Sequence, residues 1–424
     1  MSGQLSYRRG NTMMDTEAHP VTARTIGLAL SGGGSRAIAF HLGCLRALNE
    51  LGILDQVKIL STVSGASVIG ALYALNDEPF PQFEKRVRAM LARGLLWPTV
   101  RMAFTSAEGL KALLSATLTG AVNIVLFALV WIFWALSLMA PPKYRGKIRI
   151  ANWRPVRRFA SRTTILCRAL DKELFKGSRI SELKNRSPLL IINAAEMRTG
   201  SAFYFSARES GSWRLGRLAR KDIGLAHAVT ASAAFPMYMP ALDEILPFDR
   251  RDGSRRIERV CLSDGGIYDN LGLAPLWPDR DPSISLNVDQ IDTIFCCRAG
   301  YGLRHDPPNQ FFVARLISAF ASIHDRAQNA AIKRLFDLKA QGKLEAVIMP
   351  FLGQDDSRLR FPPNDLISRE EAYAYPTDFS AMAEEWIERL SRRGEQLTKA
   401  LIAEHAPNLP ASAPPMGGSP NSDR

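Results

Sequence analysis

The chain has 424 residues, of which 46% are hydrophobic and 22% are charged. This length and balance exclude a chain too short or too polar to bury a core, and they fit a globular protein of one large domain or two ordinary ones. The formal net charge of +13 indicates an anionic partner, either a nucleic acid or an acidic membrane surface. The cysteines lack metal-ligand spacing and are expected to be buried, reduced thiols: Cys44, Cys167, Cys261, Cys296 and Cys297.

The two ends of the chain differ in composition from the region between them. Residues 1–24 and 406–424 are mixed polar or rich in Pro, Ser, Gly and Asn, and we expect both to be disordered tails. The first tail carries charges but no apolar stretch, so no secretory signal peptide is expected and the protein should face the cytosol. Residues 25–405 are expected to form the folded domain.

Within that domain, short apolar runs alternate with helical patterns, which predicts an α/β fold: a sheet with helices on both faces, in three α/β/α layers. The expected strands are Ile26–Leu30, Val57–Leu60, Leu189–Ala194, Ala202–Ser206, Arg259–Leu262, Thr293–Cys297 and Leu344–Pro350. The expected helices include Arg36–Leu51, Gly65–Leu75 and Asp378–His405. The last of these has apolar residues at helical spacing and should close the domain against the sheet.

Two loops that follow expected strands contain candidate catalytic groups. The consecutive glycines Gly32, Gly33 and Gly34 can present backbone amides to an anion with no side chain in the way. Ser64 lies between a strand and a helix start made of small residues, which is the layout of a nucleophile elbow. A cradle of amides beside an exposed serine is the minimum equipment for acyl transfer.

A serine nucleophile also needs a base. Asp264 follows the expected strand Arg259–Leu262 and precedes Gly265 and Gly266, which let the backbone fold closely around a carboxylate. Taken alone, this stretch is more often an ordinary Asp-Gly turn.

Taken together, three segments resemble the signatures of the patatin-like phospholipases, in the same order: Gly32-Gly33-Gly34-Ser35-Arg36, Val63-Ser64-Gly65-Ala66-Ser67 and Asp264-Gly265-Gly266. Ala231–Pro236 resembles a helix end of that family, and Tyr375–Phe379 resembles its bacterial members. The resemblance covers about residues 25–405 apart from one apolar insertion, and it indicates a membrane-associated bacterial member.

The resemblance implies a lipid acyl hydrolase, of the phospholipase A or lysophospholipase type, that works without histidine, metal or cofactor. Ser64 would attack the ester carbonyl and Asp264 would take its proton. The amides of Gly32, Gly33, Gly34 and Gly65 would hold the oxyanion, where each donor is worth about 10²–10³ in rate. Arg36, Gly265 and Gly266 would support this arrangement.

Two positions of the elbow depart from the general pattern, which has glycine two residues before and after the serine. Thr62 and Ala66 stand there, and Ala37 replaces a usual glycine after the first loop. The β-branched Thr62 keeps open an alternative function, a membrane-bound scaffold that retains the fold without catalysis.

Other assignments of the chemistry are disfavoured. Ser61 and Ser67 lack the position of Ser64 at the corner between strand and helix. His41, His227 and His324 could complete a serine triad but lie in helical patterns where packed or surface histidines are common. A nucleotide-phosphate cradle is disfavoured because neither G-x-G-x-x-G nor a Gly-Lys-Ser/Thr loop occurs.

The insertion, residues 105–168, breaks the alternating pattern. Residues 112–142 contain no charged side chain, and this stretch exceeds the ~20 residues of a bilayer-spanning helix. A basic segment without acidic residues follows directly and should bind anionic headgroups at roughly 1 kcal/mol per residue, notably through Lys143, Arg145, Lys147 and Arg149. The adjoining apolar segment favours a membrane over a nucleic acid as the partner.

A single crossing of the bilayer would put Ser64 and Asp264 on opposite sides. A second crossing at Ile223–Leu242 is disfavoured because that stretch is rich in Ala and Ser and contains two prolines. We therefore expect a re-entrant or in-plane helix, bent near Gly120–Asn123, that dips into the cytoplasmic leaflet. The protein would be integral monotopic or tightly peripheral. A lid helix buried in a soluble core is the alternative.

Overall fold

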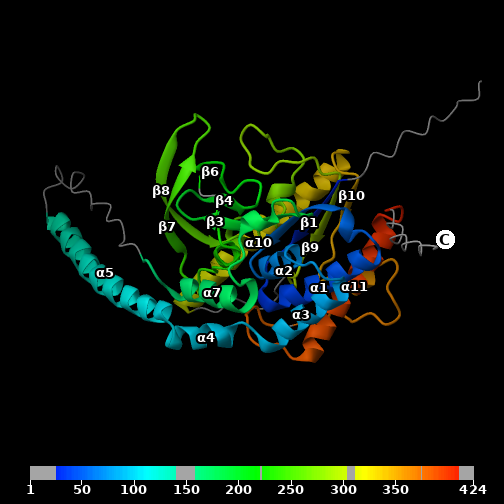
Figure 1. Ribbon diagram of the computed structural model, residues 1–424, viewed down its shortest axis with the longest axis horizontal. Helices are drawn as coiled ribbons and strands as arrows, with labels where there is room; N and C mark the ends of the chain where they lie inside the picture. Colours follow the sequence, from blue (N-terminus) through cyan, green and yellow to red (C-terminus); the bar gives the residue numbers. More distant parts are fainter. Residues whose placement is uncertain (1–24, 140–157, 220–221, 303–310, 374, 410–424) are drawn as a thin grey trace, which may run out of the picture.

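The computed structural model describes residues 25–139, 158–219, 222–302, 311–373 and 375–409 (Figure 1). Within them, ten strands form one mixed sheet in the order β10-β9-β1-β2-β3-β4-β5-β6-β7-β8. The strands are β1 (Ile26–Leu30), β2 (Val57–Val63), β3 (Leu189–Glu196), β4 (Ser201–Phe205), β5 (Gly211–Ser212), β6 (Gly216–Leu218), β7 (Leu242–Asp249), β8 (Arg255–Asp264), β9 (Thr293–Cys297) and β10 (Ala346–Ile348).

The sheet has a parallel half and an antiparallel half that meet at β3. Strands β10, β9, β1, β2 and β3 pair in parallel, whereas β3 through β8 pair antiparallel. The antiparallel half curls back on itself, because the end of β8 also pairs with β3 and sets Asp264 opposite Ala194. This closure brings the end of β8 next to the parallel strands, where β2 ends at the elbow.

One face of the sheet is covered by helices that share a large apolar core with it. They are α1 (Gly34–Glu50), α2 (Gly65–Ala74), α3 (Phe80–Arg93), α7 (Arg162–Leu170), α8 (Leu225–Ser232) and α11 (Glu384–His405). Helices α1 and α11 pack so closely that a Cβ at Gly43 would lie 1.7 Å from the Ser391 carbonyl oxygen. Burial of these continuous apolar faces is what fixes the helices to the sheet.

The opposite face carries α10 (Phe312–Ala340) and the short α9 (Gly266–Asp269) over a second apolar core. The neighbouring cysteines of β9 divide between the two faces. Cys297 belongs to the core under α1, and Cys296 to the core under α10, because successive side chains of a strand point to opposite faces. The expected three-layer α/β/α architecture is confirmed.

Several boundaries differ from expectation. Strands β1 and β9 begin and end where they were predicted. Helix α11 begins at Glu384 rather than Asp378, because residues 378–383 form a loop whose Asp378 carbonyl accepts the Ser35 amide at 2.8 Å. The chain also packs past the expected end of the domain, with Ala406 and Leu409 buried. Residues 1–24 and 410–424 lie outside the described residues.

The apolar insertion forms α5 (Ala107–Met139), which extends away from the body beyond α4 (Leu96–Thr105), as Figure 1 shows. Among the described residues it is the one helix long and apolar enough to cross a membrane. It is one continuous helix through Gly120–Asn123, and the bend expected there stays a prediction. None of its most apolar stretch is buried, which contradicts the alternative of a lid helix inside the core.

Only the base of α5 packs on the body, through Gly109, Ala112, Ser115 and Thr119. Ala112 belongs to a small apolar cluster with Ala160, so the chain leaves the body and rejoins it at the same place. Residues 140–157, which include the basic positions Lys143, Arg145, Lys147 and Arg149, lie outside the described residues.

Candidate active site

Ser64 occupies a sharp turn between β2 and α2. Its backbone has φ 54° and ψ −123°, a conformation that costs a non-glycine residue on the order of 1–3 kcal/mol and that persists only where its surroundings impose it. The next residue must be glycine, because a Cβ at Gly65 would lie 2.4 Å from the Gly34 carbonyl oxygen. The glycine-rich loop and the elbow are therefore in direct backbone contact.

Asp264 is the last residue of β8 and is only 3% exposed. Its Oδ1 accepts the Gly266 amide at 2.7 Å, and its carboxylate lies near enough to the Ser64 side chain for that side chain to lower its pKa. Burial is the larger effect and raises the pKa of Asp264 from 3.8 to about 6. The carboxylate is thus ionised at neutral pH and still basic enough to accept a proton.

The glycines after Asp264 leave room for neighbouring groups. A Cβ at Gly265 would lie 2.3 Å from the Asn193 carbonyl oxygen, and one at Gly266 would lie 2.9 Å from Asp264 Oδ1. Both positions are therefore closed to larger residues for reasons of space.

The glycine-rich loop connects β1 to α1. Its Gly32 amide donates to the Asn270 carbonyl at 3.0 Å, so Gly32 is engaged and does not fit its expected part as an oxyanion donor. Gly33, at φ 151°, and Gly34, at φ 60°, turn the chain into the helix. The amides of Gly33, Gly34 and Gly65 remain as candidate donors beside Ser64.

Arg36 ties this loop to two distant segments. Its Nε donates to the Ala299 carbonyl at 2.9 Å and its Nη1 to the Tyr375 carbonyl at 3.1 Å. Its guanidinium also lies over the Tyr301 ring, 4.6 Å from the centroid. These contacts fit the expectation that Arg36 steadies the loop.

Two residues that sequence reasoning missed hold the elbow in place. The Ser64 amide donates to the Ser232 hydroxyl at 2.9 Å, and that hydroxyl donates to the Asn193 carbonyl at 2.5 Å. The Asn193 side chain donates in turn to the Thr62 carbonyl at 2.8 Å. A lone amide in the apolar strand Leu189–Glu196 was the available signal for Asn193.

Thr62 is accommodated without distortion of the elbow. Gly70 on α2 faces it, since a Cβ at Gly70 would lie 2.5 Å from the Thr62 methyl group. Ala66 is fully buried at the start of the same helix. The crowding expected from Thr62 is relieved by this glycine in the facing turn of α2.

The alternative serines and histidines have other partners. Ser61 Oγ donates to the Gly272 carbonyl at 2.6 Å, and Ser67 Oγ lies 2.9 Å from Ser232 Oγ. The ring nitrogens of the histidines meet other groups at close range: His41 the Ser31 carbonyl at 2.9 Å, His227 the Glu244 carboxylate at 3.0 Å and His324 the Gln328 amide at 3.0 Å. Among the described residues, Asp264 is the carboxylate whose pKa the Ser64 side chain is seen to lower.

A cavity of about 700 Å³ opens beside the segment that follows Asp264. Its lining includes Gly266, Asn270 and His324, together with aromatic and arginine side chains, but neither Ser64 nor Asp264. Asn270 lies between this cavity and the glycine-rich loop, because its Oδ1 is 2.5 Å from where a Cβ of Gly32 would stand.

With this geometry in view, comparison with known proteins is informative. The sequence profile of the patatin-like phospholipase family matches residues 28–277. The chain belongs to this family. The match covers the glycine-rich loop, the elbow and Asp264, and it ends before α10 and α11.

Curated relatives match over a shorter stretch. Lysophospholipase nte1 of Aspergillus fumigatus is 39% identical over 80 residues, which is 19% of this chain and 5% of the relative. Lysophospholipase NTE1 of Kluyveromyces lactis is 37% identical over 81 residues, with the same two shares. The chain thus matches about 5% of the length of these relatives.

Two solved structures cover most of the chain at low identity. Human GIVD cytosolic phospholipase A2 matches with a TM-score of 0.49 and 13% identity, covering 89% of this chain and 61% of that chain. VipD from Legionella pneumophila matches with a TM-score of 0.36 and 13% identity, covering 90% and 67%.

Proposed function

We propose that this patatin-like protein is a lipid acyl hydrolase in which Ser64 is the nucleophile and Asp264 the base. The observation that carries the proposal is that Ser64, at a turn held at positive φ, lies beside the buried carboxylate of Asp264 and affects its pKa. The raised pKa of Asp264, about 6, suits a general base at neutral pH.

The reaction then follows from the groups around the elbow. Asp264 takes the Ser64 proton while Oγ bonds to the ester carbonyl carbon, and the carbonyl oxygen becomes an oxyanion among the amides of Gly33, Gly34 and Gly65. As the intermediate collapses, the C–O bond to the alcohol breaks and Asp264 returns the proton to the leaving oxygen. Water, deprotonated by the same carboxylate, then releases the acyl group and frees Ser64.

The substrate class is a membrane lipid ester, either a phospholipid or a lysophospholipid. The family match and the name lysophospholipase carried by the curated relatives support this choice. The scaffold alternative rested on crowding by Thr62, and the space at Gly70 removes that objection.

We place the protein at the cytoplasmic face of a membrane, docked through α5. Residues 120–139 of this helix extend about 30 Å, close to the hydrocarbon thickness of a bilayer, and their large side chains face outward, with Phe127 65% and Trp131 52% exposed. Because Ala112 and Ala160 pack together, an insertion that dips in and returns keeps both halves of the site on one side. The basic stretch that follows α5 in the sequence would meet anionic headgroups.

Labelling with a fluorophosphonate probe tests the nucleophile. Wild-type protein on lipid vesicles should react, and Ser64→Ala should not. Ser61→Ala is the control, because Ser61 is a nearby serine that is buried in β2 and bonds to Gly272, so this variant should still label. A wild type that stays unlabelled, or a Ser64→Ala variant that labels as fast as wild type, would refute the proposed nucleophile.

A further inference from the structure

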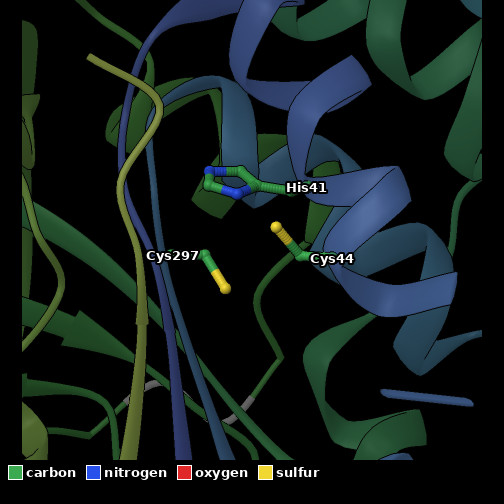
Figure 2. A group of neighbouring side chains, drawn as sticks. All are labelled: His41, Cys44 and Cys297. Carbon is green, nitrogen blue, oxygen red and sulfur yellow. The ribbon is translucent and has the colours of Figure 1, made fainter. Parts of the chain in front are cut away.

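A cluster of three metal-binding side chains lies buried behind the glycine-rich loop. Figure 2 shows His41 and Cys44 on α1, with Cys297 at the end of β9 facing them. All three residues are fully buried, and their nitrogen and sulfur ligand atoms lie within 4.8 Å of one another. The assigned reaction uses none of them.

The hydrogen bonding of the His41 ring is that of a metal-binding histidine, with one nitrogen bonded to a carbonyl and the other left with a lone pair. Its Nε2 lies 2.9 Å from the Ser31 carbonyl oxygen, and since a carbonyl only accepts, Nε2 carries the proton. Its Nδ1 therefore keeps a lone pair, and this buried atom has no hydrogen-bond partner among the described residues. Histidines that bind metals typically donate their other ring N–H to such a carbonyl, which fixes the tautomer.

The two sulfurs bring the donor set to three, so a fourth ligand such as a water molecule would complete the tetrahedron around the ion. Two thiolates and one neutral imidazole suit Zn²⁺, and the two negative charges balance the ion, so the buried site would be electrically neutral. Ligand atoms around tetrahedral zinc stand roughly 3.8 Å apart at most, for the two sulfurs. The side chains would thus have to move inward by only about 1 Å from their present separations.

We propose that His41 Nδ1, Cys44 Sγ and Cys297 Sγ bind one zinc ion that fastens α1 to β9 behind the glycine-rich loop. The loop is already anchored at that point, because the Ser31 amide donates to the Cys297 carbonyl at 3.1 Å and the Ser31 hydroxyl accepts the Ala299 amide at 2.8 Å. The ion is structural: it holds the backbone that leads into Gly33 and Gly34 and takes no part in acyl transfer.

Two other arrangements of the same residues are distinguishable by experiment. Cys44 and Cys297 could remain packed thiols, of which Cys44 makes a weak contact to the Gly394 carbonyl at 3.7 Å. They could also form a disulfide. Neither arrangement retains zinc.

The test measures zinc directly. Full-length protein, purified with reductant and dialysed against zinc sulfate and then buffer, should hold one zinc per chain by elemental analysis and by native mass spectrometry. Cys44→Ala and Cys297→Ala should each lose it. Cys296→Ala is the matched control, because its thiol is equally buried in the same strand but faces the other core, and this variant should keep the metal.

A second measurement keeps the test decisive if the alanine variants fold poorly. Wild-type protein loaded with Co²⁺ should show the intense absorption of thiolate-to-cobalt charge transfer, and zinc should abolish it. Wild type that holds no zinc, no cobalt band, zinc retained by Cys44→Ala, or a Cys44–Cys297 disulfide in freshly purified protein would each overturn the proposal.

Discussion

The backbone amide of Ser64 donates a 2.9 Å hydrogen bond to the side-chain hydroxyl of Ser232, the last residue of α8. This bond gives the strained turn a fixed partner from another element. It also connects Ser64, the proposed nucleophile, to α8, which packs against β3 and β8, so that the orientation of Ser64 depends on a residue of another element.

We expect Ser232→Ala to lower kcat by about tenfold with little change in KM, because the elbow loses about 1 kcal/mol of support that matters for orientation rather than for binding. Ser263→Ala is the control, since the Ser263 hydroxyl donates to the Ala234 carbonyl at 2.8 Å and is also buried. Equal effects of the two variants on kcat, measured on a soluble ester, would show that Ser232 acts only through stability.

The pH dependence of the reaction should follow Asp264. Because the pKa of this carboxyl is about 6 and the ionised form is the base, kcat/KM should rise through pH 6 and level off above pH 7. At pH 5 the rate should be about tenfold below the plateau. Asp264→Asn should lower kcat by about 10²–10⁴-fold, and its remaining activity should no longer rise with pH around pH 6. A profile that is flat from pH 5 to pH 8 would contradict the assignment of the base.

The Asp264 carboxyl should also make the free energy of unfolding depend on pH. Its pKa is higher in the folded protein than the usual 3.8, so its contribution to stability is present at low pH and is lost as the pH rises through about 6. Between pH 4.5 and 7.5, the wild type should therefore lose about 2 kcal/mol of unfolding free energy that Asp264→Asn does not lose. Urea unfolding of both proteins at the two pH values measures this difference, in which other titrating groups cancel.

Gly34 is expected to tolerate no side chain. Its φ is 60°, and a Cβ would lie 2.5 Å from the Asp378 carbonyl oxygen, so Gly34→Ala must displace either the loop or the segment before α11. We expect at least a hundredfold loss of kcat, about the value of one oxyanion donor, and a lower Tm. Gly120→Ala is the control: it meets nothing within 4 Å, lies in α5, and should leave kcat unchanged.

Removal of the outer part of α5 should separate membrane binding from catalysis. Residues 121–157 can be replaced by a short Gly-Ser linker, because the base of α5 packs on the body only as far as Thr119. The shortened protein should leave the membrane fraction and still hydrolyse a soluble short-chain ester. Intact protein with serine at Val125, Phe127 and Trp131 controls for the change in length and should also leave the membrane. Unchanged membrane association of both variants would contradict docking through α5.

The sequence predicts well those elements whose boundaries depend only on their own residues and their immediate neighbours in the chain. Strands β1 and β9 are short runs of mainly apolar residues, followed by Ser31 and Arg298, and both were located to the residue. Helix α11 was extended too far because the residues before Glu384 are held in a loop by backbone contacts with distant segments. The Asp378 carbonyl accepts the Ser35 amide, and the Met382 amide donates to the Leu91 carbonyl.

The parts of the site that escaped prediction depend on contacts between distant segments. The Gly32 amide donates to the Asn270 carbonyl. Because this hydrogen bond joins two backbone groups, the types of the two residues do not indicate it. The roles of Asn193 and Ser232 likewise follow from the pairing of β3 with β2 and from the packing of α8 on β3, which a pattern of apolar runs does not reveal. His41 and Cys44 share one helix face, but Cys297 joins them only when β9 takes its place beside β1.

The contact between Ala112 and Ala160 gives the chain a natural splice junction. The segment beyond Thr119 can be exchanged or shortened without changing the order of the strands, because the two ends of the insertion meet at one edge of the body.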